Sequence, residues 1–199
     1  MPSPLPPSLC RLAVAVVRFL PHALDEFAAG AGPGPLTAEA REVVIQCHLF
    51  CGFPRTIAAL DHLRSAGVPP GTDAAPPAAP GSPAAGSELF DRIYGESAPE
   101  VRAHLRSLDP DLAELVAEHA YGAVLSRGGL DARARELLAV VMLAATGHDR
   151  QLASHVRGAV RCGATPTEIS DALDAVEDLV SPECMERARD VAARFTRTG

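Results

Sequence analysis

The stretch RARELLAVVMLAATGHDRQLASHVRGAVRCGA, from Arg133 to Ala164, decides the fold expected for this chain. In its first half the apolar residues recur with the 3.6-residue period of a helix, whereas a half-buried strand would alternate strictly. Asp131 lies where an N-cap belongs before this run, and Gly147 is placed to end it. The pattern therefore predicts two consecutive helices, the second beginning near His148.

Three side chains of this stretch point to proton-transfer chemistry. Glu136 lies among apolar residues of the first helix, where a carboxylate either pairs with a cation or has its pKa raised. His148 and His155 are seven residues apart, a spacing that places both on one face of the second helix. A single helical histidine is more often structural than catalytic, so the prediction of a site rests on the three residues together.

Composition narrows the fold class and the partners. The chain has 199 residues, 47% of them hydrophobic, with no Trp, two Tyr and six Phe, so its core must consist mainly of Ala, Leu and Val, which favours an all-α fold. The formal net charge of −7 argues against nucleic acid as a partner. The apolar segment Leu9–Leu20 is too short to span a bilayer and is interrupted by Arg11 and Arg18, so no membrane association is expected.

Cysteine usage predicts reduced thiols and a cytoplasmic location, because the five cysteines are an odd number in a chain of this size. Cys47 and Cys51, four residues apart, would have Cα atoms about 6 Å apart in a helix, which is within the range of a disulfide. A regular helix nevertheless directs the two sulfurs poorly for bonding, so structural thiols are the preferred interpretation. No metal site is expected, because the cluster formed with His48 lacks a second ligand pair with zinc-finger spacing.

The chain is expected to consist of two helical halves joined by a Pro/Ala-rich linker. In residues 1–66 the helical pattern is expected to bend at Pro21 and to break at Gly52. Residues 67–86 have low complexity and are predicted to form a flexible linker, or alternatively a lid over the site. Residues 87–199 are predicted to be helical and to pack with the first half as one domain. Helices are expected to begin after the capping residues Thr37, Ser87, Asp109, Thr165 and Ser181.

From Tyr121 onward the motifs resemble those of the carboxymuconolactone decarboxylase family, which is similar in turn to the alkylhydroperoxidase D (AhpD)-like proteins. The resemblance rests on GAVLSRGGL at Gly122–Leu130, on Glu136, and on QLASHVRGAVRCGATPTEISDAL at Gln151–Leu173. The earlier segment Glu42–Leu60 resembles the part that normally follows the first motif, so the two parts stand here in permuted order. The resemblance implies an all-α, AhpD-like helical bundle that assembles as a homo-oligomer, a trimer or hexamer.

The same resemblance implies a carboxy-lyase that acts without a cofactor on a small anionic lactone or related acid. Loss of CO2 from such a lactone leaves a dienolate, which requires a cation for the spectator carboxylate, a hydrogen-bond donor at the oxyanion and a proton donor. The predicted catalytic residues are Glu136, His148 and His155. Because guanidinium groups bind carboxylates in a bidentate manner, the predicted substrate-binding residues are Arg127, Arg133, Arg135 and Arg150, together with Gln151.

Two other functions remain open at this stage. In AhpD-like peroxidases the helix after the shared glutamate carries a CxxC pair, but His148 and Gln151 occupy the corresponding positions here. A peroxidase would therefore have to use Cys47 and Cys51. A non-catalytic oligomeric binding protein would keep the fold, would tie Glu136 to Arg133 or Arg135, and would have no open cavity reaching His155.

Overall fold

The computed structural model describes residues 4–69 and 79–196, and over these residues it confirms the all-α fold, with no strand in either range. The α-helices are α1 (Pro7–Arg18), α2 (Pro21–Ala31), α3 (Ala38–Ser65), α4 (Pro83–Tyr94), α5 (Ala98–Leu108), α6 (Pro110–Leu115), α7 (Ala132–Thr146), α8 (Asp149–Arg161), α9 (Pro166–Asp174) and α10 (Pro182–Thr196). Two short 3₁₀ helices, η1 (Gly95–Ser97) and η3 (Glu177–Leu179), and a π-helical segment, η2 (Val116–Leu125), complete the chain.

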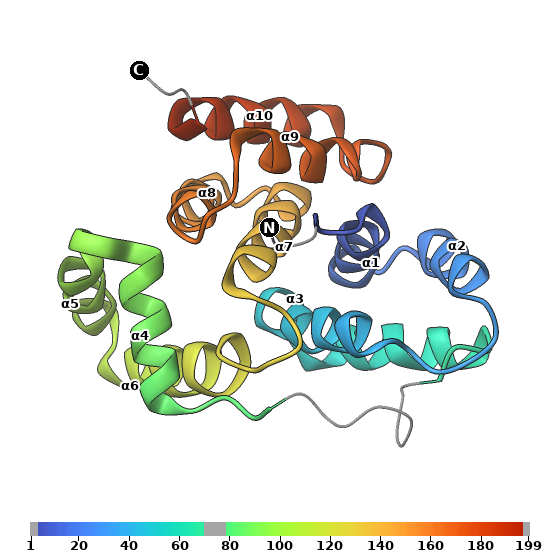
Figure 1. Ribbon diagram of the computed structural model, residues 1–199, viewed down its shortest axis with the longest axis horizontal. Coiled ribbons are helices and arrows are strands. Elements are labelled where there is room, and N and C mark those ends of the chain that lie inside the picture. The colour runs from blue at the N-terminus through green and yellow to red at the C-terminus, as the bar shows by residue number, and fades with distance from the viewer. Residues whose placement is uncertain (1–3, 70–78, 197–199) are drawn as a thin grey trace.

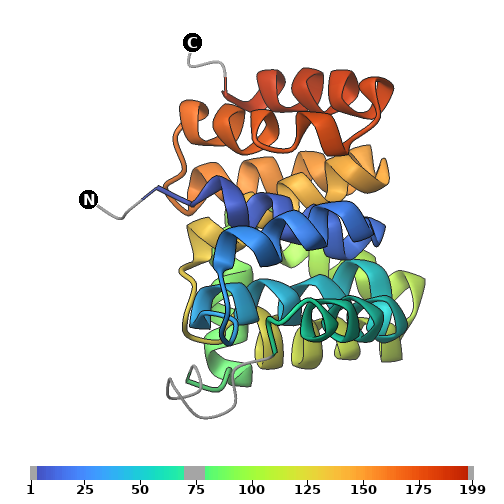
Figure 2. The ribbon, with the colours of Figure 1, turned by 90° about the vertical axis from the view of Figure 1, so that its right-hand side faces the viewer.

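The helices lie in stacked layers with α7 near the centre (Figure 1). α8 and α1 flank α7, α9 and α10 cover one side of this layer, and α3 lies on the other side (Figures 1 and 2). α4 and α5 form a separate group that packs on η2 and α8. Since α1 contacts both α3 and α7, the part of the chain before the linker shares a hydrophobic core with the part after it.

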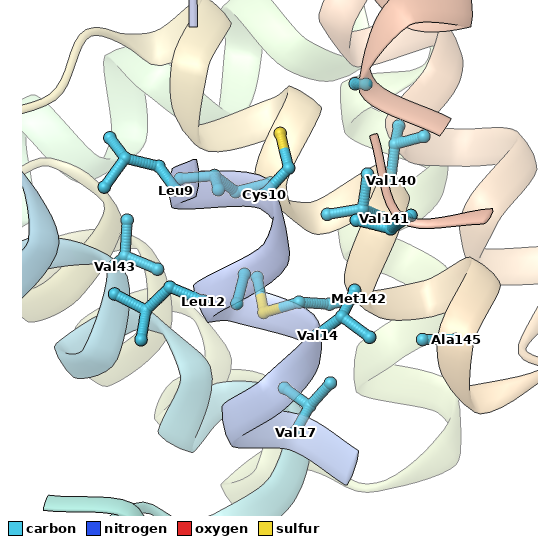
Figure 3. Close-up of a cluster of buried hydrophobic side chains, with 14 of the residues drawn as sticks. Leu9, Cys10, Leu12, Val14, Val17, Val43, Val140, Val141, Met142 and Ala145 are labelled. Atoms are coloured by element: carbon cyan, nitrogen blue, oxygen red, sulfur yellow. The ribbon is translucent and has the colours of Figure 1, made fainter. Parts of the chain in front are cut away.

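The apolar N-terminal segment is a core helix. The side chains from Leu12 to Val17 of α1 are fully buried, as are almost all residues of α7. Figure 3 shows how these helices interdigitate, with labelled side chains Leu9, Cys10, Leu12, Val14 and Val17 from α1, Val43 from α3, and Val140, Val141, Met142 and Ala145 from α7. Burying each Leu or Val contributes about 1.5–3 kcal/mol, so the contact between α1 and α7 is a main source of stability.

Most of the expected helix boundaries are confirmed. The side chains of Thr37, Asp109, Asp131 and Thr165 accept hydrogen bonds from backbone N–H groups at the starts of α3, α6, α7 and α9. Gly147 ends α7 in the left-handed conformation, with φ of 72°. Gly52 interrupts α3 with φ of 75° and ψ of 164°, and the bend expected at Pro21 is a complete break between α1 and α2.

The start of α4 differs from the expectation. Ser82, and not Ser87, caps this helix by accepting a hydrogen bond of 3.2 Å from the Ala85 N–H, and Pro83 takes the first helical position. Proline is favoured there because its missing N–H would have no intrahelical partner. The end of the segment predicted as a linker is therefore helical, while residues 70–78, on which the lid prediction falls, lie outside the described residues.

Among the described helices, α3 is the one that is long and apolar enough to cross a bilayer by length and composition alone. It is broken at Gly52, it packs against α1, and it buries the polar side chains of Glu42 and Gln46. These are features of a core helix in a helical bundle.

Candidate functional site

Glu136 and His155 meet where α7 packs against α8. The Nδ1 atom of His155 lies 3.0 Å from Oε2 of Glu136. The carboxylate side chain is 1% exposed, whereas the imidazole is 15% exposed. Nε2 of His155 has no hydrogen-bond partner within residues 4–69 and 79–196. The pair therefore combines a buried acid with a partly exposed imidazole whose second nitrogen makes no hydrogen bond within the described residues.

The electrostatics of the pair favour the protonated form of the imidazole. Burial alone would lower the pKa of His155, but the negative charge of Glu136 and its hydrogen bond outweigh burial and raise the pKa above its usual value. Because a carboxylate accepts hydrogen bonds, Nδ1 carries the proton that lies between the two groups. This arrangement fixes the ring, and an imidazole held in this way can give or accept a proton at Nε2.

The surroundings of the pair are mostly apolar or aromatic. The ring of Phe50 from α3 meets the imidazole edge-on, with centroids 6.2 Å apart. Gly158 lets α8 approach closely, because a Cβ atom there would lie 2.2 Å from Oε2 of Glu136 and 2.9 Å from Cγ2 of Ile93. Replacing this glycine must therefore displace both the carboxylate and the isoleucine side chain.

Two tyrosines, Tyr94 of α4 and Tyr121 of η2, lie within electrostatic range of Glu136. The hydroxyl of Tyr121 donates a hydrogen bond of 3.1 Å to that of Tyr94. Burial is the main cause that raises the pKa of both phenols, and the charge of Glu136 adds to it. Both tyrosines are therefore neutral hydrogen-bond donors at ordinary pH.

His148 does not join Glu136, and the expectation that three side chains converge is wrong in this respect. His148 precedes α8 as its N-cap, with φ of −97° and ψ of 66°, so helical spacing does not relate it to His155. It is exposed, and its Nδ1 atom lies 2.9 Å from the hydroxyl of Thr146. Only the acid and one imidazole form the candidate site.

Arg127 and Arg135 bind a buried carboxylate of the protein itself. Nη2 of Arg127 lies 2.8 Å from Oε1 of Glu42, and Nη2 of Arg135 lies 3.0 Å from Oε2. The side chains of Arg135 and Glu42 are only 1% and 2% exposed. Burial alone would raise the pKa of Glu42, but the two guanidinium groups outweigh it and lower the pKa. The sequence predicted that these two arginines bind substrate. In the structure they pair with Glu42 instead and belong to the core.

The other predicted substrate-binding residues are divided between the core and the surface. Arg133 is buried and forms an ion pair with Glu168, whose carboxylate also completes the capping box of α9. It is therefore a structural residue, contrary to the expectation. Arg150 and Gln151 lie exposed in the first turn of α8. Their role as substrate-binding residues stays a prediction.

The thiols of Cys47 and Cys51 are unsuited to nucleophilic chemistry. Cys47 is fully buried, and its Sγ donates to the carbonyl of Ala13 at 3.7 Å, while Sγ of Cys51 donates to the carbonyl of Cys47 at 3.3 Å. Burial raises the pKa of both thiols, that of Cys47 well above its usual range. A thiol peroxidase needs a thiolate, so this environment argues against the redox alternative.

Two of the described cavities lie elsewhere. A cavity of about 740 Å³ is bordered by α1, α2 and the start of α7, with Leu9, Phe27 and Leu130 among its lining residues. One of about 140 Å³ lies between α4, α5 and η2. Neither is lined by Glu136 or His155, although the ring of Tyr121 lines the smaller one.

Comparison with known proteins relates this site to a family. The model of the carboxymuconolactone decarboxylase family matches residues 110–194, which run from α6 into α10 and contain Glu136 and His155. The chain is 29% identical over 148 residues to Peroxisomal protein 2 of Schizosaccharomyces pombe, covering 72% of this chain and 69% of that protein. It is 38% identical over 74 residues to nitrosuccinic acid decarboxylase of Metarhizium robertsii, covering 37% of this chain and about half, 52%, of that protein. Through the region that holds the acid–imidazole pair, the chain is therefore similar to the carboxymuconolactone decarboxylase family.

Proposed function

We propose that this protein is a carboxymuconolactone decarboxylase-like enzyme that protonates carbon during the decarboxylation of a small anionic lactone or related acid. The observation that carries the proposal is the 3.0 Å contact between the buried Glu136 and the partly exposed His155. The match of residues 110–194 to the carboxymuconolactone decarboxylase family model and the similarity to a protein named as a nitrosuccinic acid decarboxylase support the reaction class.

In the proposed reaction the bond between the substrate carbon and its carboxylate breaks, and CO2 leaves. The electron pair of that bond passes into an adjacent electron-accepting group, such as the lactone carbonyl, and gives an enolate-type anion. Nε2–H of the His155 imidazolium then protonates the carbon, and water restores the proton to the imidazole. Glu136 orients the ring through Nδ1 and stabilises its charged form, as its effect on the pKa of His155 indicates.

The substrate class follows from what the intermediate requires. Decarboxylation is easiest where a strong electron-accepting group neighbours the carboxylate, as in a γ-lactone or a nitro-substituted dicarboxylic acid. A second carboxylate would need a cation, and the exposed Arg150, beside Gln151 at the start of α8, is the candidate that remains after the other predicted arginines are assigned to the core.

The test is CO2 release from a carboxylated γ-lactone and from nitrosuccinate, with wild type, His155→Gln and Glu136→Gln. We expect the two variants to lose about 10²–10⁴-fold in turnover, because each removes part of the general acid. His148→Gln, a substitution of the exposed histidine outside the pair, is the control and should keep its activity. Full turnover by a folded His155→Gln variant would disprove the proposal.

The two other functions have less support. Counting free thiols by mass spectrometry after peroxide treatment should show Cys47 and Cys51 unchanged, since burial keeps both protonated. A non-catalytic binding protein was expected to tie Glu136 to Arg133 or Arg135 and to have no open cavity reaching His155. These arginines pair instead with Glu168 and Glu42, which argues against this function. None of the described cavities is lined by His155, which is compatible with it. We further propose that the protein is cytoplasmic and that it forms a homo-oligomer, a trimer or hexamer. Sedimentation of the purified chain would test the oligomeric state.

A further inference from the structure

A second pair of imidazoles meets outside the candidate site. The Nε2 atoms of His48 in α3 and His119 in η2 lie 2.7 Å apart, although 71 residues separate them in the sequence. The ring planes are inclined by 60°, with centroids 5.0 Å apart. His48 is half-buried and His119 is exposed, so solvent reaches the point at which the two nitrogens converge.

The ring of His48 is fixed so that its Nε2 lone pair faces His119. Nδ1 of His48 is hydrogen-bonded to the backbone carbonyl of Ile45, and since a carbonyl can only accept, Nδ1 carries the proton. The ring of Phe53 stacks on that of His48 at 4.8 Å with an angle of 11°, which also restrains the orientation. An Nδ1–H donated to a carbonyl is the contact that commonly orients metal-binding histidines.

We propose that His48 and His119 bind a divalent transition-metal ion of the Cu²⁺ or Ni²⁺ type through their Nε2 atoms. In the metal-free state one proton lies between the two nitrogens. On binding, any ring proton of His119 must lie on Nδ1, which has no partner within the described residues. The Nε2 lone pairs of both rings are then available to the ion.

The spacing of the two nitrogens selects the kind of ion. Two ligands at 90° in a tetragonal site, each about 2.0–2.1 Å from the metal, lie about 2.8–3.0 Å apart, whereas the tetrahedral angle of zinc requires about 3.3 Å. The observed 2.7 Å is closer to the first value. Because the centroids lie 5.0 Å apart, the two rings meet end to end, so the exposed His119 ring must swing aside before both lone pairs can face one ion. Imidazole ligands and tetragonal geometry are typical of Cu²⁺ and Ni²⁺.

The protein supplies only these two ligands. Among the described residues no group of three or more His, Cys, Asp or Glu side chains could hold an ion. The nearby Cys51 thiol is engaged with the carbonyl of Cys47 and with Thr56. Water or a small anion would therefore complete the coordination, and the ion would link α3, just before its break at Gly52, to the π-helical η2.

This metal site is separate from the Glu136–His155 pair. Phe50, which contacts His155, is two residues beyond His48 on α3, so a rotation of about 100° per residue places the two side chains on nearly opposite faces. The ion would stabilise the packing of α3 on η2 and take no part in proton transfer, so metal binding and turnover can be tested independently.

The test is calorimetric titration of the untagged, chelator-treated full chain with Ni²⁺ at pH 7.5. We expect one Ni²⁺ per chain, an affinity at least tenfold weaker in His48→Gln and in His119→Gln, and unchanged affinity in His104→Gln, a control at an exposed histidine on α5. Ni²⁺ should also raise the thermal midpoint of the wild type but not that of the double variant.

Three outcomes would overturn the proposal. They are the absence of stoichiometric binding by the wild type, equal affinity in a folded double variant, and an equal loss of affinity in His104→Gln. His119→Gln keeps the test valid if His48→Gln fails to fold, because His119 is exposed and its substitution removes no core contact.

Discussion

Removing the charge of Glu42 should destabilise the protein severely. The Glu42 carboxylate is 2% exposed and bonds two guanidinium groups, one of which, on Arg135, is 1% exposed. In Glu42→Gln the positive charge of Arg135 stays buried without a counter-charge, which costs about 3–5 kcal/mol when one partner of a buried pair is lost. For a chain of this size that corresponds to a fall of about 6–20 °C in the midpoint of thermal unfolding.

Urea unfolding and calorimetry would measure this effect. Asp91→Asn is a matched control, because it breaks an ion pair with Arg102 in which the aspartate is 57% exposed. An exposed pair of this kind contributes only about 0–1 kcal/mol. The double variant Glu42→Leu/Arg135→Met should be much less destabilised than the sum of its single variants, because it removes both buried charges. A loss below about 1 kcal/mol in Glu42→Gln would refute the assignment of these arginines to the core, since an unpaired buried charge costs more than that.

Three further predictions concern the packing and charge of the structure. Gly158→Ala should cost about 1–3 kcal/mol in unfolding free energy, as overpacked substitutions do, and should impair turnover, because the new Cβ collides with the Glu136 carboxylate. The pKa of His155 is raised on folding, so its contact with Glu136 stabilises the protein fully below the unfolded pKa, and this stabilisation is lost as pH rises through the folded pKa. The difference in unfolding free energy between wild type and His155→Gln, measured in urea, should therefore be larger at pH 6 than at pH 9. An equal difference at the two pH values would contradict a stabilising contact between His155 and Glu136. Ser82→Ala should lower the free energy of unfolding by about 1 kcal/mol, because the α4 cap is lost. An unchanged urea midpoint would show that the helix begins elsewhere.

The sequence alone determined the helical class and most helix boundaries, because periodicity and capping are local. Thr37, Asp131 and Thr165 act as caps through contacts three residues away. The start of α4 was misplaced for a local reason as well, since Ser82 and Ser87 offer the same capping side chain and the proline after Ser82 decided between them.

Only the tertiary structure decided which charged groups form pairs. Arg135 and Glu136 are adjacent in sequence, yet the arginine bonds Glu42, 93 residues away, while the acid bonds His155 on the neighbouring helix. Adjacent residues of a helix point about 100° apart, so packing directs them into different environments. The interaction of two buried charges depends on their separation in space and on the water excluded around them, and neither quantity is encoded in the spacing of residues along the chain.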